Sequence, residues 1–354
     1  MDSPAHGGPV DDELAAVGLR AEDVLDFSVN VNPYGPCPSV LRAIAEAPLH
    51  RYPDPSAAPT RRALAAHLDE PDARVILGNG AVDLLWLLAR AWLRPGDLAM
   101  AIEPTFSEMQ RAAMQAGARI LEHRTLPRND FALDIPALDA QLHAFRPRLV
   151  YVCSPSNPVG VVTPFEVLED LAERHPDTLF VCDVSFLSLS AHHGIARPSR
   201  RIVWVCSLTK DHALPGLRMG YAVAPEPLVA RMEAERPPWS IGAPAQAAIL
   251  ATFEPEAQRF VDESRVRLLQ DRAALEARLH HLDLRTHPSD TVYVLVYLGG
   301  RRLATDLRRT LLERHAVLVR DATSFGLPGH IRLAARPLPD TELLVSALRQ
   351  ELRP

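Results

Sequence analysis

The chain has 354 residues, of which 47% are hydrophobic and 23% charged, and its formal net charge is −6 at pH 7. This balance is typical of a globular protein, and the negative charge without any basic tract argues against nucleic-acid binding. The most apolar stretch, residues 81–93, is too short and too charged to span a membrane, and the four cysteines form no C-x-x-C pair, so we expect a cytoplasmic protein.

The first 50 residues are expected to form an N-terminal arm, with a short helix at 11–17 and an extended stretch at 25–33. Beyond them, short apolar runs alternate with amphipathic segments. We expect strands at 74–77, 98–103, 148–153, 178–183, 201–207 and 220–224. We expect helices at 56–69, 81–93, 106–116, 164–174 and 254–279. This alternation predicts an α/β fold with a mostly parallel sheet that is covered on both faces.

The pattern changes beyond residue 280, where strands and helices suggest a small α+β domain. The expected strands are 291–298, 316–321 and 330–336, and the expected helices are 301–314 and 340–352. We therefore divide the chain into three parts. These are an arm at 1–50 that belongs to the small domain, a large domain at 51–250, and a linking helix with the C-terminal small domain at 251–354.

One lysine stands among 37 arginines, and its position suggests chemistry. Only a lysine amine can lose its proton and form a Schiff base with a carbonyl, whereas arginine stays protonated. Lys210 directly follows an expected strand, with Ser207 three residues before it and Arg218 eight residues after it. Asp183 ends another strand, and ligands of open α/β sheets bind beyond such strand ends. A Schiff-base lysine, a carboxylate and a phosphate cup are what pyridoxal phosphate requires.

The S-x-T-K-x7-R arrangement around Lys210 resembles the fold-type I pyridoxal-phosphate enzymes of the aminotransferase class I/II family. Within that family the sequence is most similar to the threonine-phosphate decarboxylases of cobalamin biosynthesis, and next to the histidinol-phosphate aminotransferases. The resemblance extends from His6 to Arg336. It implies a large domain with a mostly parallel seven-stranded sheet, a small C-terminal α+β domain, and pyridoxal 5'-phosphate as the cofactor.

The resemblance implies roles for residues that would bind the cofactor. Lys210 would hold it as a Schiff base, Asp183 would face the pyridinium nitrogen, and Asn157 would donate to the phenolic oxygen. Tyr52 resembles a tyrosine that reaches the cofactor phosphate of the other subunit, which implies a homodimer with shared active sites. The remaining residues are the ring-stacking Phe106 and the phosphate-binding set Gly80, Ala81, Val82, Ser207, Thr209 and Arg218.

On the substrate side, Arg332 resembles the arginine that binds the α-carboxylate, and Arg320 one that reaches a distal phosphate. An Ala-His-Gly-Gly arm before D-F-S-x-N-x-N-P resembles the decarboxylase branch, in which a histidine equivalent to His6 helps bind the substrate phosphate. Asn32 and Asn157 would lie near the substrate. The implied substrate is a small, phosphorylated amino acid, and we expect no metal site.

Three departures from the family pattern affect the expected substrate pocket. Val184 follows Asp183 where the family usually has glutamate, and no tyrosine lies nearby to contact the phenolic oxygen. Asp211 and His212 replace two aromatic residues after Lys210, and Gly242 stands where the decarboxylases carry asparagine.

The sequence leaves three hypotheses open. The first is a decarboxylase of an O-phospho-amino acid, such as L-threonine O-3-phosphate, working through the Schiff base and a quinonoid intermediate. The second is an aminotransferase, either of the histidinol-phosphate type or a divergent enzyme acting on a phosphorylated or phosphonate amino acid. The third is a non-catalytic regulatory protein, although no basic DNA-binding segment accompanies the chain.

Overall fold

The computed structural model describes residues 6–194, 197–300 and 302–352 of the chain. Seven strands form the large sheet. In spatial order they are β2 (Val75–Asn79), β8 (Met219–Val223), β7 (Ile202–Ser207), β6 (Leu179–Asp183), β5 (Leu149–Cys153), β3 (Leu98–Glu103) and β4 (Arg119–Arg124). Only β8 runs antiparallel to its neighbours. The predicted seven-stranded, mostly parallel sheet is therefore confirmed.

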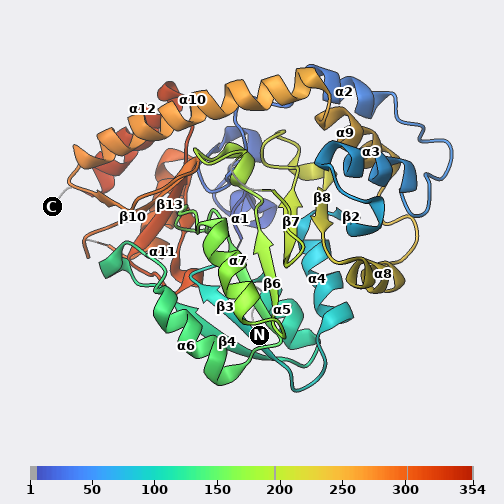
Figure 1. Cartoon of the computed structure of the whole chain (residues 1–354). Helices are drawn as coiled ribbons and strands as arrows, with labels where there is room; N and C mark the ends of the chain where they lie inside the picture. Colours follow the sequence, from blue (N-terminus) through green and yellow to red (C-terminus); the bar gives the residue numbers. More distant parts are fainter. Residues whose placement is uncertain (1–5, 195–196, 301, 353–354) are drawn as a thin grey trace.

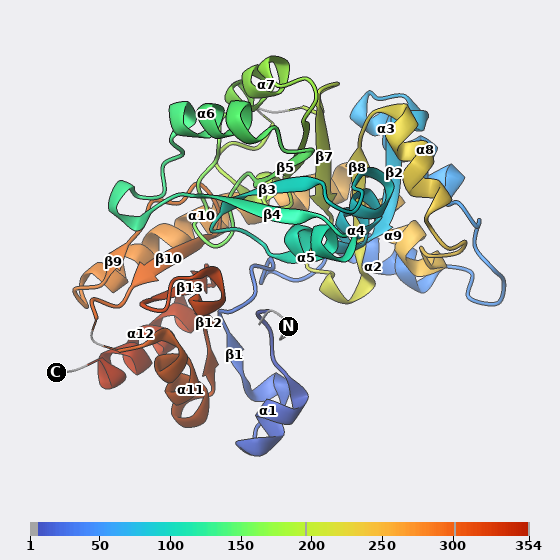
Figure 2. The ribbon, with the colours of Figure 1, turned by 90° about the horizontal axis from the view of Figure 1, so that it is seen from below.

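Both faces of this sheet are buried, which explains why its strands are continuous apolar runs rather than alternating ones. Along β5, Val150 and Val152 face one core, whereas Leu149 and Tyr151 face the other. Figures 1 and 2 show helices on both sides of the sheet. One face packs on α4 (Ala81–Trp92), α5 (Glu108–Gln115) and α8 (Glu226–Ala234). The other packs on α2 (Pro38–Ala45), α3 (Ala58–Leu68), α6 (Ile135–Phe145), α7 (Phe165–Arg174) and α9 (Ala243–Thr252).

The long helix α10 (Pro255–His280) leads into the smaller C-terminal domain, which lies beside the large sheet in Figure 2. Its sheet is antiparallel and is flanked by α11 (Ala304–His315) and α12 (Leu338–Glu351). The strands, in spatial order, are β12 (Arg320–Asp321), β13 (His330–Ala334), β10 (Tyr293–Tyr297) and β9 (Arg285–Thr286).

The N-terminal arm pairs with a strand of the small domain, and one expected strand is divided in two as a result. Residues 316–321 form two short strands instead of one, β11 (Val317–Leu318) and β12. β11 pairs in parallel with β1 (Leu25–Asp26) of the arm, whereas β12 pairs with β13. The chain thus changes partner at Val319, because the arm supplies a neighbouring strand that local sequence cannot reveal. Helix α1 (Asp11–Ala16) lies just before β1.

Within the described residues, no helix combines the length and apolarity needed to cross a bilayer. The same residues contain no group of three or more His, Cys, Asp or Glu side chains placed to bind a metal ion.

Candidate active site

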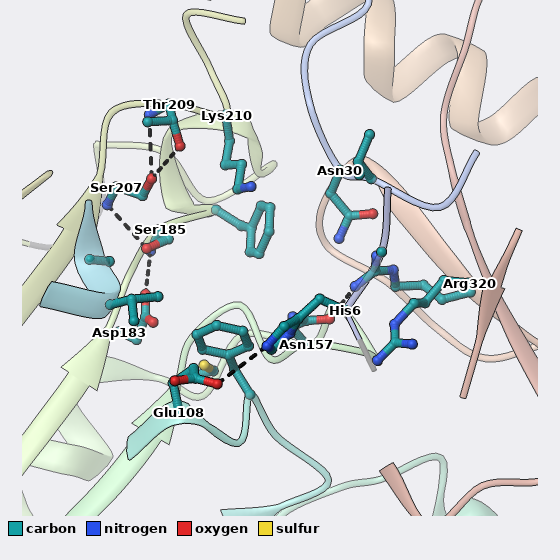
Figure 3. Close-up of a pocket in the computed structure, with 18 of the residues that line it drawn as sticks. His6, Asn30, Glu108, Asn157, Asp183, Ser185, Ser207, Thr209, Lys210 and Arg320 are labelled. Carbon is teal, nitrogen blue, oxygen red and sulfur yellow. Dashed lines mark hydrogen bonds and ion pairs between the residues drawn. The ribbon is translucent and has the colours of Figure 1, made fainter. Parts of the chain in front are cut away.

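A cavity of about 470 Å³ lies where the carboxyl ends of the large sheet meet the small domain and the arm. Its size is within the range of small-molecule and cofactor sites. The loops after β5 and β7 supply Asn157 and Lys210, and the last residue of β6 is Asp183. The small domain supplies Arg320. Figure 3 shows these side chains converging on one space, with His6 of the arm on the side opposite Lys210.

Lys210 points into the cavity from the loop after β7. Burial lowers the pKa of its amine to about 8, and the nearby guanidinium groups of Arg218 and Arg332 act in the same direction. Asp183 opposes the shift without cancelling it. The single lysine is therefore held in a state from which it readily loses its proton, as Schiff-base chemistry requires.

Asp183 is fully enclosed at the end of β6, and three hydrogen-bond donors hold its carboxylate. The backbone N–H of Ser185 donates to Oδ1 at 3.0 Å, and the Ser185 hydroxyl also stabilises the ionised form. The hydroxyl of Tyr151 donates to Oδ2 at 3.1 Å from within the sheet. Burial raises the pKa of Asp183, and these hydrogen bonds counteract that rise. The arrangement suits a carboxylate that must stay charged opposite a pyridinium nitrogen.

Hydroxyl groups link this carboxylate to the expected phosphate cup. The N–H of Ser207 donates to the Ser185 hydroxyl at 3.1 Å, and the Ser207 and Thr209 hydroxyls lie 2.7 Å apart (Figure 3). Ser207, Thr209 and Arg218 all line the cavity. Two hydroxyls beside one guanidinium are suited to a phosphate.

The glycine turn before α4 contributes differently from the way the sequence suggests. The N–H of Gly80 donates to the carbonyl of Gly78 at 2.8 Å, so it is already engaged. Gly80 has φ +82°, and a Cβ atom there would lie 2.5 Å from Nη2 of Arg218. Gly80 thus makes room for Arg218, while Ala81 and Val82 line the cavity at the start of the helix.

Arg332 and Asn157 form a pair on the side of the cavity toward the small domain. Nη1 of Arg332 donates to Oδ1 of Asn157, and Nη2 donates to the backbone carbonyl of Ser28 in the arm. Burial lowers the pKa of the Arg332 guanidinium to about 10. Its Nε has no hydrogen-bond partner among the described residues. A desolvated guanidinium with unused donor capacity is suited to a carboxylate ligand.

Two further side chains line the cavity: Arg320, which was expected there, and Asn30, which was not. Arg320 donates to the Ser324 hydroxyl at 2.7 Å and lies 5.0 Å from the Phe325 ring centre. Asn30 is only 3% exposed and lines the cavity, yet neither atom of its amide has a partner in the described structure. Such an orphaned amide indicates a ligand. The D-F-S-x-N-x-N-P motif contains both Asn30 and Asn32, and its pattern does not show that Asn30 is the one facing the cavity.

Asn32 lies behind the cavity rather than in its wall. Its side chain donates to the carbonyl of Asp211 at 2.9 Å, and its backbone N–H donates to the carbonyl of Lys210 at 2.9 Å. Asn32 therefore supports the loop that carries the lysine. Asp211 and His212, which replace two aromatic residues, are both buried. Val184 is buried as well and packs in the hydrophobic core.

Tyr52 is not brought to the cavity of its own chain. Its side chain is 81% exposed, and its ring centre lies 5.2 Å from that of Trp239. Gly242 is close by in sequence as the N-cap of α9. Phe106, in contrast, lines the cavity at the start of the segment before α5, next to the ring of His6 at a centroid distance of 5.8 Å.

The residues in the cavity fit pyridoxal phosphate in kind and in position. They offer a lysine amine with a lowered pKa, a buried carboxylate, an aromatic ring and a phosphate cup that needs Gly80 to remain without a side chain. When bound, this cofactor supplies an electron sink for the bonding electrons of the substrate α-carbon.

Comparison with known proteins gives the same assignment. Residues 22–349 match the family model for aminotransferase class I and II. A threonine-phosphate decarboxylase from Salmonella typhimurium is 32% identical, over 98% of this chain and 96% of its own. A histidinol-phosphate aminotransferase from Moorella thermoacetica is 30% identical, over 98% and 89%.

Solved structures agree with the fold. Histidinol-phosphate aminotransferase from Sinorhizobium meliloti, solved with pyridoxal 5'-phosphate, superposes with a TM-score of 0.87 at 22% identity, covering 100% of this chain and 95% of its own. L-threonine-O-3-phosphate decarboxylase from Porphyromonas gingivalis gives 0.82 at 26% identity, covering 92% and 98%. The fold is thus the predicted fold type I. The chain belongs to the aminotransferase class I and II family and is a pyridoxal-phosphate-dependent enzyme.

Proposed function

We propose that the enzyme decarboxylates a small O-phospho-amino acid of the L-threonine O-3-phosphate type. The observation that supports this most strongly is the pairing of Arg320 and Arg332. They are direct cross-strand partners in the β12–β13 ladder, so both guanidinium groups leave the same face of the small sheet. Two guanidinium groups on one face can bind two anionic groups of a single ligand. A substrate with a carboxylate for Arg332 and a distal phosphate for Arg320 matches this arrangement.

In this proposal each residue acts on a stated part of the substrate. Arg332 binds the α-carboxylate, and Arg320 with His6 binds the phosphate. Lys210 would hold the cofactor through its amine, and the same amine, once free, would carry the proton that replaces the lost carboxylate at the α-carbon. Asp183 would hold its negative charge opposite the ring nitrogen, and Phe106 would pack on the ring.

Transamination is the second candidate, and the 30% identity to the Moorella histidinol-phosphate aminotransferase supports it. The same side chains serve both reactions, and the outcome depends on which α-carbon bond stands perpendicular to the ring. Incubation of the purified enzyme with O-phosphothreonine tests the choice. Release of CO2 and a phosphorylated amine supports decarboxylation. Formation of a 2-oxo acid, or turnover of histidinol phosphate alone, would assign the enzyme to the aminotransferases instead.

We also propose that the enzyme is a homodimer in which Tyr52 reaches the partner's cofactor phosphate. Three large side chains are exposed on this chain: Tyr52 (81%), Leu49 (77%) and Trp239 (48%). Exposed apolar surface of this kind often marks a contact with another protein. Light scattering tests the dimer. Mixing Tyr52→Ala with Lys210→Ala chains tests the shared site, since only a mixed dimer restores one complete site.

A further inference from the structure

Glu108 is a buried carboxylate in the wall of the cavity, and it has no role in the chemistry proposed above. It is the first residue of α5 and only 4% exposed. Three donors hold it from three segments. Arg111 donates to Oε1 at 2.8 Å, the Trp86 indole donates to Oε2 at 3.1 Å, and Nε2 of His6 lies 3.3 Å from Oε1.

His6 belongs to the arm, and the two glycines after it pack closely against Ser28, a later residue of the same arm. A Cβ atom at Gly7 would overlap the carbonyl oxygen of Ser28. Gly8 has φ +106°, and its N–H donates to the Ser28 hydroxyl at 2.8 Å. The same Ser28 carbonyl accepts a hydrogen bond from Arg332. The arm therefore crosses the cavity from Glu108 on the large domain to Ser28 beside Arg332.

A carboxylate in this position needs an explanation, because it lies on the side of the cavity where a substrate phosphate is proposed to bind. Alone, Glu108 would repel the phosphate that Arg320 is proposed to bind. Its charge is instead matched by Arg111, which also lines the cavity, and Nε2 of His6 lies within ion-pair distance. The contact with the carboxylate directs the imidazole ring of His6 toward α5. Figure 3 shows the Glu108–His6 contact at the side of the cavity away from Lys210.

We propose that Glu108 is the positioning residue that fastens the arm across the cavity and makes the distal subsite selective for a phosphate group. Glu108 does so by orienting His6 and Arg111 together, so that their donor groups supplement Arg320. This inference rests on the proposed function, because it deepens the choice of a phosphorylated substrate. In this proposal, the contact between the arm and α5 provides selectivity for a phosphorylated substrate, which the cofactor-binding residues do not provide.

The variant Glu108→Gln tests the proposal in the cofactor-loaded enzyme, because it keeps the shape of the side chain and removes the charge. We measure kcat/KM for O-phosphothreonine against threonine, and for histidinol phosphate against histidinol. Selectivity for the phosphorylated substrate should fall at least tenfold, mainly through KM. Hydrogen–deuterium exchange of residues 6–10 should become about tenfold faster, because this segment would lose its contact with Glu108 and keep only the one with Ser28.

Two further variants separate positioning from general structure. Glu233→Gln removes another Glu–Arg pair at the same i, i+3 spacing, on α8 and outside the cavity. It should change neither selectivity nor arm exchange. In a His6→Ala background, Glu108→Gln should lower selectivity by less than in the wild type, because part of its effect passes through His6.

Unchanged or increased selectivity in Glu108→Gln, with arm exchange also unchanged, would overturn the proposal. Full additivity with His6→Ala would overturn it as well. If the wild type turns over no phosphorylated substrate, the proposed function fails. The exchange measurement then still decides whether Glu108 fastens the arm, since it requires no turnover.

Discussion

Replacement of Tyr151 by phenylalanine is the sharpest test of how the sheet controls the cofactor carboxylate. The change removes one hydroxyl and with it the hydrogen bond to Oδ2 of Asp183, while the fully buried ring keeps its packing. A hydrogen bond to a charged group contributes about 1.5–3 kcal/mol. Because Ser185 still holds Oδ1, we expect the lower end, about 1.5 kcal/mol, which corresponds to roughly tenfold in an equilibrium constant.

The loss should appear as weaker cofactor binding with a particular pH dependence. Burial already raises the pKa of Asp183, and Tyr151 is one of the groups that hold it down. Without Tyr151 that pKa rises further, so a larger share of the carboxyl is neutral and must ionise before it can pair with the ring nitrogen. The penalty should be largest at and below the pKa of the wild-type carboxyl, and it should shrink as pH rises and the carboxyl becomes ionised in both proteins. Titration of the cofactor-free protein, followed by the cofactor's absorbance, measures it.

Tyr34→Phe is the matched control, because it removes a similar hydrogen bond of 2.5 Å from a tyrosine to Asp271 outside the cavity. It should leave cofactor affinity unchanged. Equal cofactor affinity in Tyr151→Phe and wild type across the pH range would refute the reasoning, and so would an equal loss in both variants.

Two other predictions concern the lysine and the glycine turn. Since the pKa of Lys210 is lowered to about 8 and only the neutral amine attacks a carbonyl, attachment of cofactor should accelerate up to about pH 8 and level off above it. Stopped-flow absorbance measures this, and a rate independent of pH between 6.5 and 9 would contradict it. Gly80→Ala should weaken cofactor binding by ~tenfold or more through overlap with Arg218, whereas Gly96→Ala, at φ +90° with open space around it, should cost only stability. Equal cofactor affinities of the two variants in an equilibrium titration would exclude the steric explanation.

The strands that form the centre of the large sheet could be predicted because both of their faces are buried. The sequence does not reveal β4, since this edge strand carries Arg119, Glu122 and Arg124 and lacks an apolar run. Nor does it reveal α2 and α9, two short helices that pack against each other although they lie about 200 positions apart in the sequence. The division of residues 316–321 into two strands depends on β1, which is equally remote in sequence.

Site residues could be predicted where their spacing within one short segment carries the information, and not where tertiary contacts decide their place. Lys210, Ser207 and Arg218 lie within one short segment, so their spacing carries the information. Asn30 and Asn32 are two positions apart in an irregular segment, and tertiary contacts decide that Asn32 supports the lysine loop while Asn30 faces the cavity.

Glu108 was missed for a related reason. With Arg111 three residues later, it looks like an ordinary surface ion pair on a helix, and only the arm from the start of the chain reveals its place in the cavity.

The single lysine gives the enzyme an unusual analytical property. Amine-directed reagents such as activated esters find one side-chain target in the whole chain, besides the α-amino group. In the proposed site, that target is the amine that cofactor binding consumes. The extent of acylation at Lys210 therefore counts the cofactor-free sites in any preparation. Protein coupled to a support through its side-chain amine would by the same reasoning be inactive, so immobilisation of this enzyme requires another functional group.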